Sequence, residues 1–244
     1  MENNNNKTST DMDAKRVKRI AIIPARCGSK GLLNKNVKPL NGKPMLLYSV
    51  EAAINSHSFD TVFVSTDSRE YAKIAEKAGA DCHFLRSTKN SSDNASSWDT
   101  VREVIYRFEE EGKKFDEIML LQPTSPLRNC EDILASIKLM CEKRALAVDS
   151  VTEMDHSPLW SNTLPSDGNM RGFFTEYSNL PRQFLPKYYR ENGAIYLVKR
   201  ELIDKPDSEI FLHRAYAYIM PRERSIDIDV ELDFKIAELL MEKE

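Results

Sequence analysis

The sequence predicts an α/β fold, a doubly wound and mostly parallel β-sheet that carries a small extension. Short apolar runs rich in β-branched residues alternate with amphipathic stretches at helical spacing, which is typical of strands joined by right-handed helical crossovers. This alternation stops after about residue 153, where prolines and aromatic residues become frequent. A chain of 244 residues is long enough for one large domain and a smaller appendage.

The first half of the chain contains two predicted strand–helix units. Strands and helices alternate at residues 20–24, 45–56, 59–67 and 69–77. Pro44 stands at the first turn of the first helix, where a missing N–H removes no helical hydrogen bond. Ser68 is a favourable N-cap for the second helix, and Gly79 suits its C-terminal end because glycine readily adopts the left-handed conformation.

The second half begins with a long polar segment at residues 84–97. A functional loop and a mobile surface loop are both possible interpretations of this segment. Regular elements then return. We expect a helix at 98–110, strand at 117–122, helix at 131–143, strands at 145–152, 193–198 and 215–220, and a final helix at 231–243.

The pattern divides the chain into three parts. Residues 1–17 are expected to be a disordered polar lead-in. Residues 18–152 and 205–244 form the predicted α/β core. Residues 153–204 are too irregular for another strand–helix unit, and we expect them to form an extension that covers the site or makes a subunit contact.

Composition argues against several classes of protein. A net charge of −3 with one basic loop disfavours nucleic-acid binding, which usually requires a broad basic face. The sequence contains no run of eighteen apolar residues, so no membrane span is predicted. The N-terminus lacks the apolar region of a secretion signal. The four cysteines show no C-x-x-C spacing, which favours a reducing cytoplasm over a disulfide framework or a structural zinc site.

A cationic loop after the first strand provides the main functional signal. Between residues 14 and 50 there are nine Lys or Arg and no Asp or Glu. Small residues let a backbone approach a ligand closely, and fixed cations with N–H donors bind a polyphosphate. The loop lacks the Walker A and dinucleotide patterns, and a solvated basic loop is the alternative. Its small and cationic residues are Arg26, Gly28, Ser29, Lys30, Gly31 and Lys35.

Two further strand ends contribute polar residues to the same predicted edge. In doubly wound sheets, ligands bind outside the carboxyl ends of the strands. The strands that end near Pro24, Asp67 and Gln122 therefore bring candidate side chains together. These are Arg26, Lys30, Asp67, Gln122, Thr124, Ser125 and Arg128.

Two aspartates, Asp227 and Asp229, precede the last predicted helix. In an extended segment, residues two apart share a face, so both carboxylates point the same way while Ile226 and Ile228 turn inward. Two such carboxylates suit Mg²⁺, which completes its shell with phosphate oxygens. An acidic N-terminal cap on the following helix is the alternative.

Taken together, five segments in this order resemble the acylneuraminate cytidylyltransferase family, the CMP-sialic acid synthetases. They are IPAR with GSKG and KN (23–26, 28–31, 35–36), QPTSPLR (122–128), PRQ (181–183), NGAIY (192–196) and SIDID (225–229). The resemblance covers nearly the whole chain after about residue 18. It implies a Rossmann-like fold of the nucleotide-diphospho-sugar transferase type, a homodimer formed through the extension, and Mg²⁺ as cofactor with Mn²⁺ as an alternative.

The resemblance also implies a reaction and its residues. The anomeric hydroxyl of an acidic nine-carbon 2-keto sugar would attack the α-phosphate of CTP and release pyrophosphate. Asp227 and Asp229 would hold the metal. The implied CTP-binding residues are Arg26, Ser29, Lys30, Lys35, Asn36, Arg86 and Ser96, and the implied sugar-binding residues are Gln122, Thr124, Ser125, Arg182, Asn192, Tyr196 and Phe211. Among all of these, Arg26, Lys35, Arg182 and Asp229 are the predicted catalytic set.

Two departures from the family pattern leave the sugar open. Cys27 stands where the family often has glycine, and Ile210-Phe211 stands where some members have a pair of phenylalanines. Legionaminate, pseudaminate and the eight-carbon sugar Kdo are therefore alternatives to sialate, and one methyl-sized change in such a pocket shifts preference by only about 1–3 kcal/mol. An alternative of another class is a non-catalytic module that binds nucleotide sugars. We expect such a module to have lost the cationic loop or the acidic pair, and both are present here.

Overall fold

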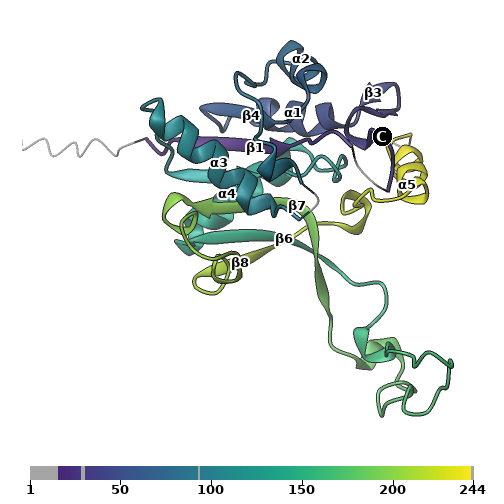
Figure 1. The fold of residues 1–244 in the computed structure, drawn as a ribbon. Helices are drawn as coiled ribbons and strands as arrows, with labels where there is room; N and C mark the ends of the chain where they lie inside the picture. Colours follow the sequence, from purple (N-terminus) through teal and green to yellow (C-terminus); the bar gives the residue numbers. More distant parts are fainter. Residues whose placement is uncertain (1–15, 29–30, 93, 243–244) are drawn as a thin grey trace, which may run out of the picture.

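A computed structural model describes residues 16–28, 31–92 and 94–242 of the chain. Its main sheet has six strands in the order β4-β1-β5-β7-β6-β8 (Figure 1). These are β1 (Arg19–Pro24), β4 (Thr61–Ser65), β5 (Glu117–Leu120), β6 (Ala147–Glu153), β7 (Tyr189–Lys199) and β8 (Ala215–Ile219). Among these strands only β7 runs antiparallel to its neighbours, so the predicted mostly parallel sheet is confirmed.

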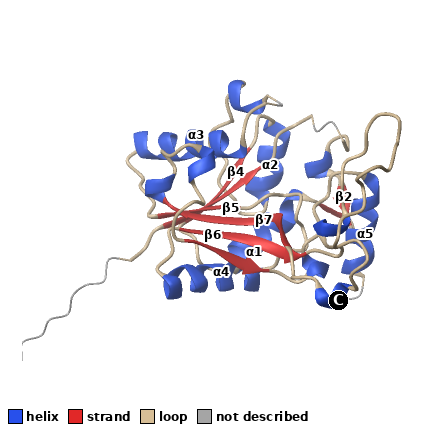
Figure 2. Cartoon of the chain, turned by 90° about the horizontal axis from the view of Figure 1, so that it is seen from below, coloured by secondary structure: helices blue, strands red, loops and turns tan. Residues whose placement is uncertain are grey.

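Helices cover both faces of this sheet, with α3 on one side and α1 and α4 on the other (Figure 2). The α-helices in the described residues are α1 (Leu46–Asn55), α2 (Arg69–Lys77), α3 (Ser97–Glu110), α4 (Cys130–Lys143) and α5 (Glu231–Met241). Each begins and ends within two residues of its predicted bounds, and side-chain caps fix the starts of α2, α3 and α4. Ser68 accepts a hydrogen bond from the Tyr71 N–H, and Ser96 forms a capping box with Asp99. None of the helices in the described part of the chain is long and apolar enough to cross a bilayer.

The apolar core consists of two main layers, one on each side of the sheet. Ile22 and Ile23 of β1 are both fully buried but point to opposite faces, since side chains alternate along a strand. Ile23 packs in the layer under α1 and α4, whereas Ile22 packs under α3 with residues such as Val104 and Phe108. Burial on both faces explains why the central strands are continuous apolar runs.

A small hairpin that the sequence analysis did not predict supports the acidic segment. It pairs β2 (Pro39–Leu40) with β3 (Lys43–Pro44) through an Asn-Gly turn, in which both turn residues have positive φ. Leu40 of this hairpin packs with Ile228 and with Phe234 of α5 in a third apolar cluster. The hairpin therefore holds residues 225–229 against the segment that follows the cationic loop.

Between β6 and β7 the chain leaves the sheet as a projecting arm, residues 154–188 (Figure 1). Six large apolar side chains of this arm are exposed: Leu164, Met170, Phe174, Tyr177, Leu180 and Phe184. The extension was expected to run over residues 153–204, but β7 lies within that range and pairs with both β5 and β6. The chain thus rejoins the sheet at Tyr189, earlier than expected.

Candidate active site

A polar cavity of about 200 Å³ opens at the carboxyl edge of the sheet. Its wall combines the ends of β1 and β5 with the N-terminus of α3 and the polar segment before it. Six residues singled out from the sequence line it together: Arg26, Asn36, Arg86, Ser96, Gln122 and Thr124. Their convergence follows from the topology, since parallel strands end at one edge of a sheet.

The loop after β1 is held by hydrogen bonds from both sides. The Cys27 N–H donates to Asp67 Oδ1 at 2.7 Å, and the Asn36 amide donates to the Arg26 carbonyl at 3.0 Å. Asp67 and Asn36 thereby position the backbone around Arg26. Two residues predicted to bind CTP, Ser29 and Lys30, lie outside the described residues.

Gly31 brings this loop against the acidic segment. A Cβ atom at Gly31 would lie 2.7 Å from the Asp229 carbonyl oxygen, which is closer than real Cβ atoms approach. Only glycine therefore permits this contact between backbones. The requirement places the cationic loop and the two aspartates side by side, although nearly 200 residues separate them in the chain (|i−j| = 194 for Lys35 and Asp229).

Lys35 and Asp229 form the ion pair that joins these two segments. The Lys35 ammonium donates to the Ile228 carbonyl at 2.6 Å and to Asp229 Oδ1 at 3.0 Å. Lys35 is 9% exposed, whereas the Asp229 side chain is 72% exposed. A buried ammonium needs a partner, and the exposed carboxylate keeps its second oxygen open to solvent.

Asp227 carries the feature that best fits a metal ion. Its Oδ1 is buried and has no hydrogen-bond partner among the described residues. Burial raises the pKa of Asp227, the nearby charge of Asp229 raises it further, and the Thr124 hydroxyl lowers it. An unpartnered carboxylate oxygen beside a second carboxylate is a hard donor set of the kind that Mg²⁺ takes together with phosphate oxygens. The described residues contain no group of three or more His, Cys, Asp or Glu that forms a larger metal site.

Arg86 and Ser96 line the polar cavity and also make hydrogen bonds that hold the surrounding structure. Arg86 is 8% exposed and donates to the Ser65 hydroxyl and carbonyl at 3.0 and 2.5 Å. Burial lowers the pKa of Arg86 to about 10, so its guanidinium stays charged at neutral pH. Ser96 caps α3 by accepting from the Asp99 N–H at 3.0 Å.

On the other side of Gln122, a bulge in β7 shapes a second part of the site. Gly193 lies in this bulge with φ of 73°, a conformation that favours glycine. A Cβ atom there would lie 3.4 Å from Gln122 Oε1 and 3.7 Å from both Ser125 Oγ and Asp227 Oδ2. The side chains of Gln122, Ser125 and Asp227 therefore converge on one point above Gly193.

Asn192 holds this bulge from inside the protein. Its Oδ1 accepts from the Ser150 hydroxyl at 2.6 Å, and its amide nitrogen donates to Ser225 Oγ at 2.9 Å. The residue is 1% exposed. The Asn192 side chain, predicted to contact the sugar, is thus fully engaged inside the protein, where it braces the β6–β7 junction.

Aromatic side chains form the wall next to this bulge. Tyr196 and Phe211, both predicted from the sequence, pack against each other and against Trp98, with ring centroids 6.0–6.2 Å apart. Trp98 was not predicted as a site residue, because an apolar side chain in the first turn of an amphipathic helix is usually a core residue. Its neighbour Ser97 lines the polar cavity, whereas Trp98, Tyr196 and Phe211 pack against the core layer under α3.

Arg182 lies apart from the other predicted catalytic residues. It is in a short 3-10 turn of the arm (Arg182–Phe184) and lines a separate cavity of about 370 Å³ with Glu153 and Lys187. Its nearest carboxylate is Glu153, at 3.9 Å. Within one chain, therefore, Arg182 is not brought to the site that Arg26, Lys35 and Asp229 share.

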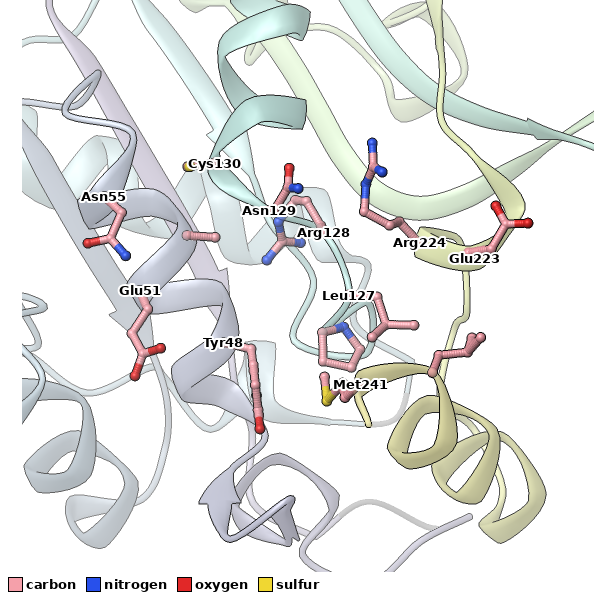
Figure 3. Close-up of a pocket in the computed structure, with 13 residues that line it drawn as sticks. Tyr48, Glu51, Asn55, Leu127, Arg128, Asn129, Cys130, Glu223, Arg224 and Met241 are labelled. Atoms are coloured by element: carbon pink, nitrogen blue, oxygen red, sulfur yellow. The ribbon is translucent and has the colours of Figure 1, made fainter. Parts of the chain in front are cut away.

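A third cavity of about 450 Å³ lies between α1, residues 126–130 and the end of α5 (Figure 3). Of the candidate residues named from the sequence, it is lined by Arg128 and not by those of the polar cavity. Arg128, in its wall, donates to the carbonyls of Gln122 and Ala194 at 3.3 and 2.9 Å and to the Ser49 hydroxyl at 2.5 Å. Arg128 is 2% exposed, so this cation ties the Gln122 loop to β7 and α1 from behind the site.

Comparison with known proteins identifies the family of this chain. The model of the cytidylyltransferase family matches residues 20–164. An N-acylneuraminate cytidylyltransferase of Escherichia coli O18:K1:H7 is 37% identical over 93% of this chain and 53% of its own length, so the chain spans about half of that relative. The post-translational flagellin modification protein B of Campylobacter coli is 34% identical over 92% of this chain and 95% of its own.

Two further comparisons concern the sugar and the fold. A CMP-N,N'-diacetyllegionaminic acid synthase of Legionella pneumophila is 32% identical over 91% of this chain and 96% of its own length. Among solved structures, a CMP:2-keto-3-deoxy-manno-octonic acid synthetase complexed with CTP superposes with a TM-score of 0.66 at 19% identity, covering 93% of this chain and 99% of that one. At that identity the likeness establishes the fold alone.

Proposed function

The chain belongs to the cytidylyltransferase family, and from this premise we propose that it joins CTP to an acidic nine-carbon 2-keto sugar, N-acetylneuraminate or a close relative. The products would be the CMP-sugar and pyrophosphate. The curated relatives are named for both sialate and legionaminate, which agrees with a sugar of this class. We place the reaction in the reducing cytoplasm, with the product serving as an activated donor for surface polysaccharide biosynthesis.

One observation carries this proposal. The polar cavity, with Arg26 and Arg86 in its wall, adjoins a segment in which Lys35 contacts Asp229 and Asp227 keeps a buried oxygen without a partner among the described residues. Fixed cations beside paired carboxylates suit a nucleoside triphosphate that binds with a divalent ion. The alternatives were a solvated basic loop and an acidic helix cap. Neither alternative explains why the cationic segment and the acidic segment contact each other.

The proposed reaction needs positioning and charge neutralisation rather than a covalent intermediate. A bond forms between the anomeric oxygen and the α-phosphorus of CTP, the bond from that phosphorus to the pyrophosphate oxygen breaks, and the proton of the anomeric hydroxyl is released to solvent. Arg26 and Lys35 neutralise the charge that develops on the departing pyrophosphate. Asp227 and Asp229 would hold Mg²⁺, or Mn²⁺ in its place, which when bound supplies Lewis-acid stabilisation of the phosphate oxygens.

The sugar is proposed to lie over Gly193, where Gln122, Ser125 and Asp227 converge. Thr124, Tyr196 and Phe211 border the same region, and Arg182 is the proposed partner of the sugar carboxylate, as a planar guanidinium suits that group. Because Arg182 projects on the arm, 58% exposed, we propose a homodimer in which it acts in the site of a second copy. The exposed apolar side chains of the arm are suited to such a contact.

The test is pyrophosphate release from CTP and Mg²⁺ with sialate, legionaminate, pseudaminate and Kdo offered separately. We expect rapid release with one nine-carbon sugar and at least about tenfold less with Kdo. Sedimentation of the same protein should give a dimer. Silence with all four sugars in a protein that still binds CTP would overturn the proposal and favour the non-catalytic binding module.

A further inference from the structure

One row of side chains across the sheet is apolar on three strands and polar on the next two. Backbone pairing aligns Phe63, Ile22, Leu120, Tyr196 and Asp149 on strands β4, β1, β5, β7 and β6. Paired residues point to the same face, here the face that α3 covers. The first three are buried apolar side chains, whereas the last two are a phenol and a carboxylate. An acid in a row that is otherwise part of the core calls for a physical reason.

The position of Asp149 links it to the part of the site proposed for the sugar. Asp149 and Tyr196 are the first paired residues beyond the β7 bulge that contains Gly193. Tyr196 in turn packs against Trp98, whose neighbour Ser97 lines the polar cavity. Asp149 is thus linked through Tyr196 and Trp98 to the first turn of α3, whose Ser97 lines the polar cavity.

The Asp149 carboxylate is not neutralised from within the protein. Its Oδ1 is buried and accepts no hydrogen bond from any described residue. Burial, and to a lesser extent the negative charge of the exposed Glu191, raise the pKa of Asp149 to about 7, although a hydrogen bond from the Ser150 backbone N–H acts in the opposite direction. Tyr196, whose own pKa is raised by burial and by Asp149, Glu191 and Asp227, is the phenol beside it. An ionised carboxylate only accepts hydrogen bonds, so the missing partner is a donor.

We propose that Asp149 determines which sugar is used, by accepting a hydrogen bond from one N–H or O–H on the sugar substituent that faces Tyr196. This inference rests on the proposed function and sharpens it. A site with a buried acceptor rejects an analogue that lacks the matching donor, since binding that analogue leaves the acceptor unpaired. The selected sugar thus carries a hydroxyl or an acylamino N–H at that position, and a sugar with hydrogen or methyl there is a poor substrate.

The test combines variants of Asp149 with changes in the sugar. Starting from whichever nine-carbon sugar the wild type uses best, analogues that each lack one hydroxyl or acylamino group are compared by kcat/KM in wild type, Asp149→Asn and Asp149→Ala. We expect one deletion to cost the wild type about 100-fold and Asp149→Ala less than about threefold. Asparagine retains an acceptor oxygen, so Asp149→Asn should preserve part of the discrimination.

Glu191→Gln is the matched control, since it removes a nearby negative charge that is exposed. We expect this variant to keep the wild-type preference among the analogues and all variants to keep the KM for CTP. Equal losses with every analogue in Asp149→Ala, or the same change of preference in Glu191→Gln, would overturn the role of Asp149 while leaving the reaction in place. A wild type that is silent with every sugar would overturn the proposed function and, with it, this inference.

Discussion

The buried carboxylates at the two ends of the central sheet differ in their hydrogen-bond partners. At the amino edge of the parallel strands, Glu117 of β5 is 2% exposed and accepts from Arg19 Nε and Lys199 Nζ, each at 2.5 Å. At the carboxyl edge, Asp149 and Asp227 each keep a buried oxygen that no described residue satisfies. Burial raises the pKa values of both aspartates.

The difference in hydrogen-bond partners distinguishes a carboxylate that stabilises the fold from carboxylates proposed to act in the site. Taking a carboxylate out of water is costly unless cations and donors surround it. At the Glu117 end, the chain supplies those partners itself, and the site is complete. At the other end, the chain supplies cations and acids in neighbouring segments and leaves acceptor oxygens without a partner among the described residues, as the proposed substrate site requires.

The largest expected effect comes from changing the carboxyl edge. Asp229→Asn should lower turnover by roughly 100- to 1,000-fold, because charge stabilisation at the transferring phosphate is lost. The amide still accepts from Lys35, so the fold should persist, as checked by circular dichroism. Kinetics of pyrophosphate release with varied Mg²⁺ measure the effect, and chelation of the metal should abolish activity in both proteins.

Glu231→Gln is the control for that experiment. Glu231 is an exposed acid at the start of α5 that pairs with Lys38 at 2.6 Å and does not contact Lys35. We expect its activity to stay within about twofold of wild type, since an exposed ion pair contributes little. Near-normal turnover in folded Asp229→Asn would remove the metal assignment.

The next effect concerns the opposite edge and should appear in stability rather than rate. Glu117→Gln leaves Arg19 and Lys199 without their shared charge, and we expect the free energy of unfolding to fall by about 2–3 kcal/mol. That corresponds to a drop in melting temperature of roughly 5–10 °C for a chain of this size. At temperatures where the variant is folded, its kcat should match the wild type.

Glu142→Gln supplies the matched surface pair for this measurement. Glu142 and Lys138 are exposed and 3.8 Å apart. The loss of this ion pair should change the free energy of unfolding by less than about 0.5 kcal/mol. If Glu117→Gln melted within 2 °C of wild type, or lost activity while folded, the division between a structural and a functional edge would not hold.

The smallest effect is a pH dependence of stability. The pKa of Asp149 is about 7 in the folded protein and ordinarily near 3.8, so between these values the folded state binds more protons than the unfolded state. Wild-type stability attributable to this group is therefore full below pH 4 and is lost as pH rises through 7. The shift allows at most about 4 kcal/mol, and we expect about 2 kcal/mol because the half-buried carboxyl is partly hydrated.

Asp149→Asn removes that slope, which melting curves at several pH values measure. Relative to wild type, the variant should gain stability from pH 4 to pH 7.5, by several degrees in melting temperature. A constant difference over this range would mean that Asp149 is not held at an elevated pKa.

Local features of the chain were predictable because they depend on few residues. The bounds of α2, Arg69–Lys77, follow from a serine cap before it and a glycine just after it. The cationic loop, the QPTSPLR segment and the acidic pair were each found as contiguous motifs, and Arg26 and Asn36 of the first line one cavity with Gln122 and Thr124 of the second. The Asn-Gly hairpin was missed even though its turn residues are a strong signal, because two-residue strands carry no alternation.

Other features depend on pairing that no local pattern encodes. The insertion of β7 between β5 and β6, antiparallel to both, was not foreseen. The same holds for the inward turn of Asn192, and for Asp149, which in an alternating strand pattern indicates only a solvated face. Its row partners are set by register, and the residues in register with it lie far away in the sequence.

The sequence by itself thus determined the elements, the cationic loop and the acidic pair, since caps, periodicity and motifs act over a few neighbouring residues. Tertiary structure alone decided which charges meet. Arg19 reaches Glu117 across 98 positions and Lys35 reaches Asp229 across 194. Whether a buried carboxylate is neutralised or left for a ligand depends on such contacts, because electrostatic energy is set by distance and burial rather than by separation along the chain.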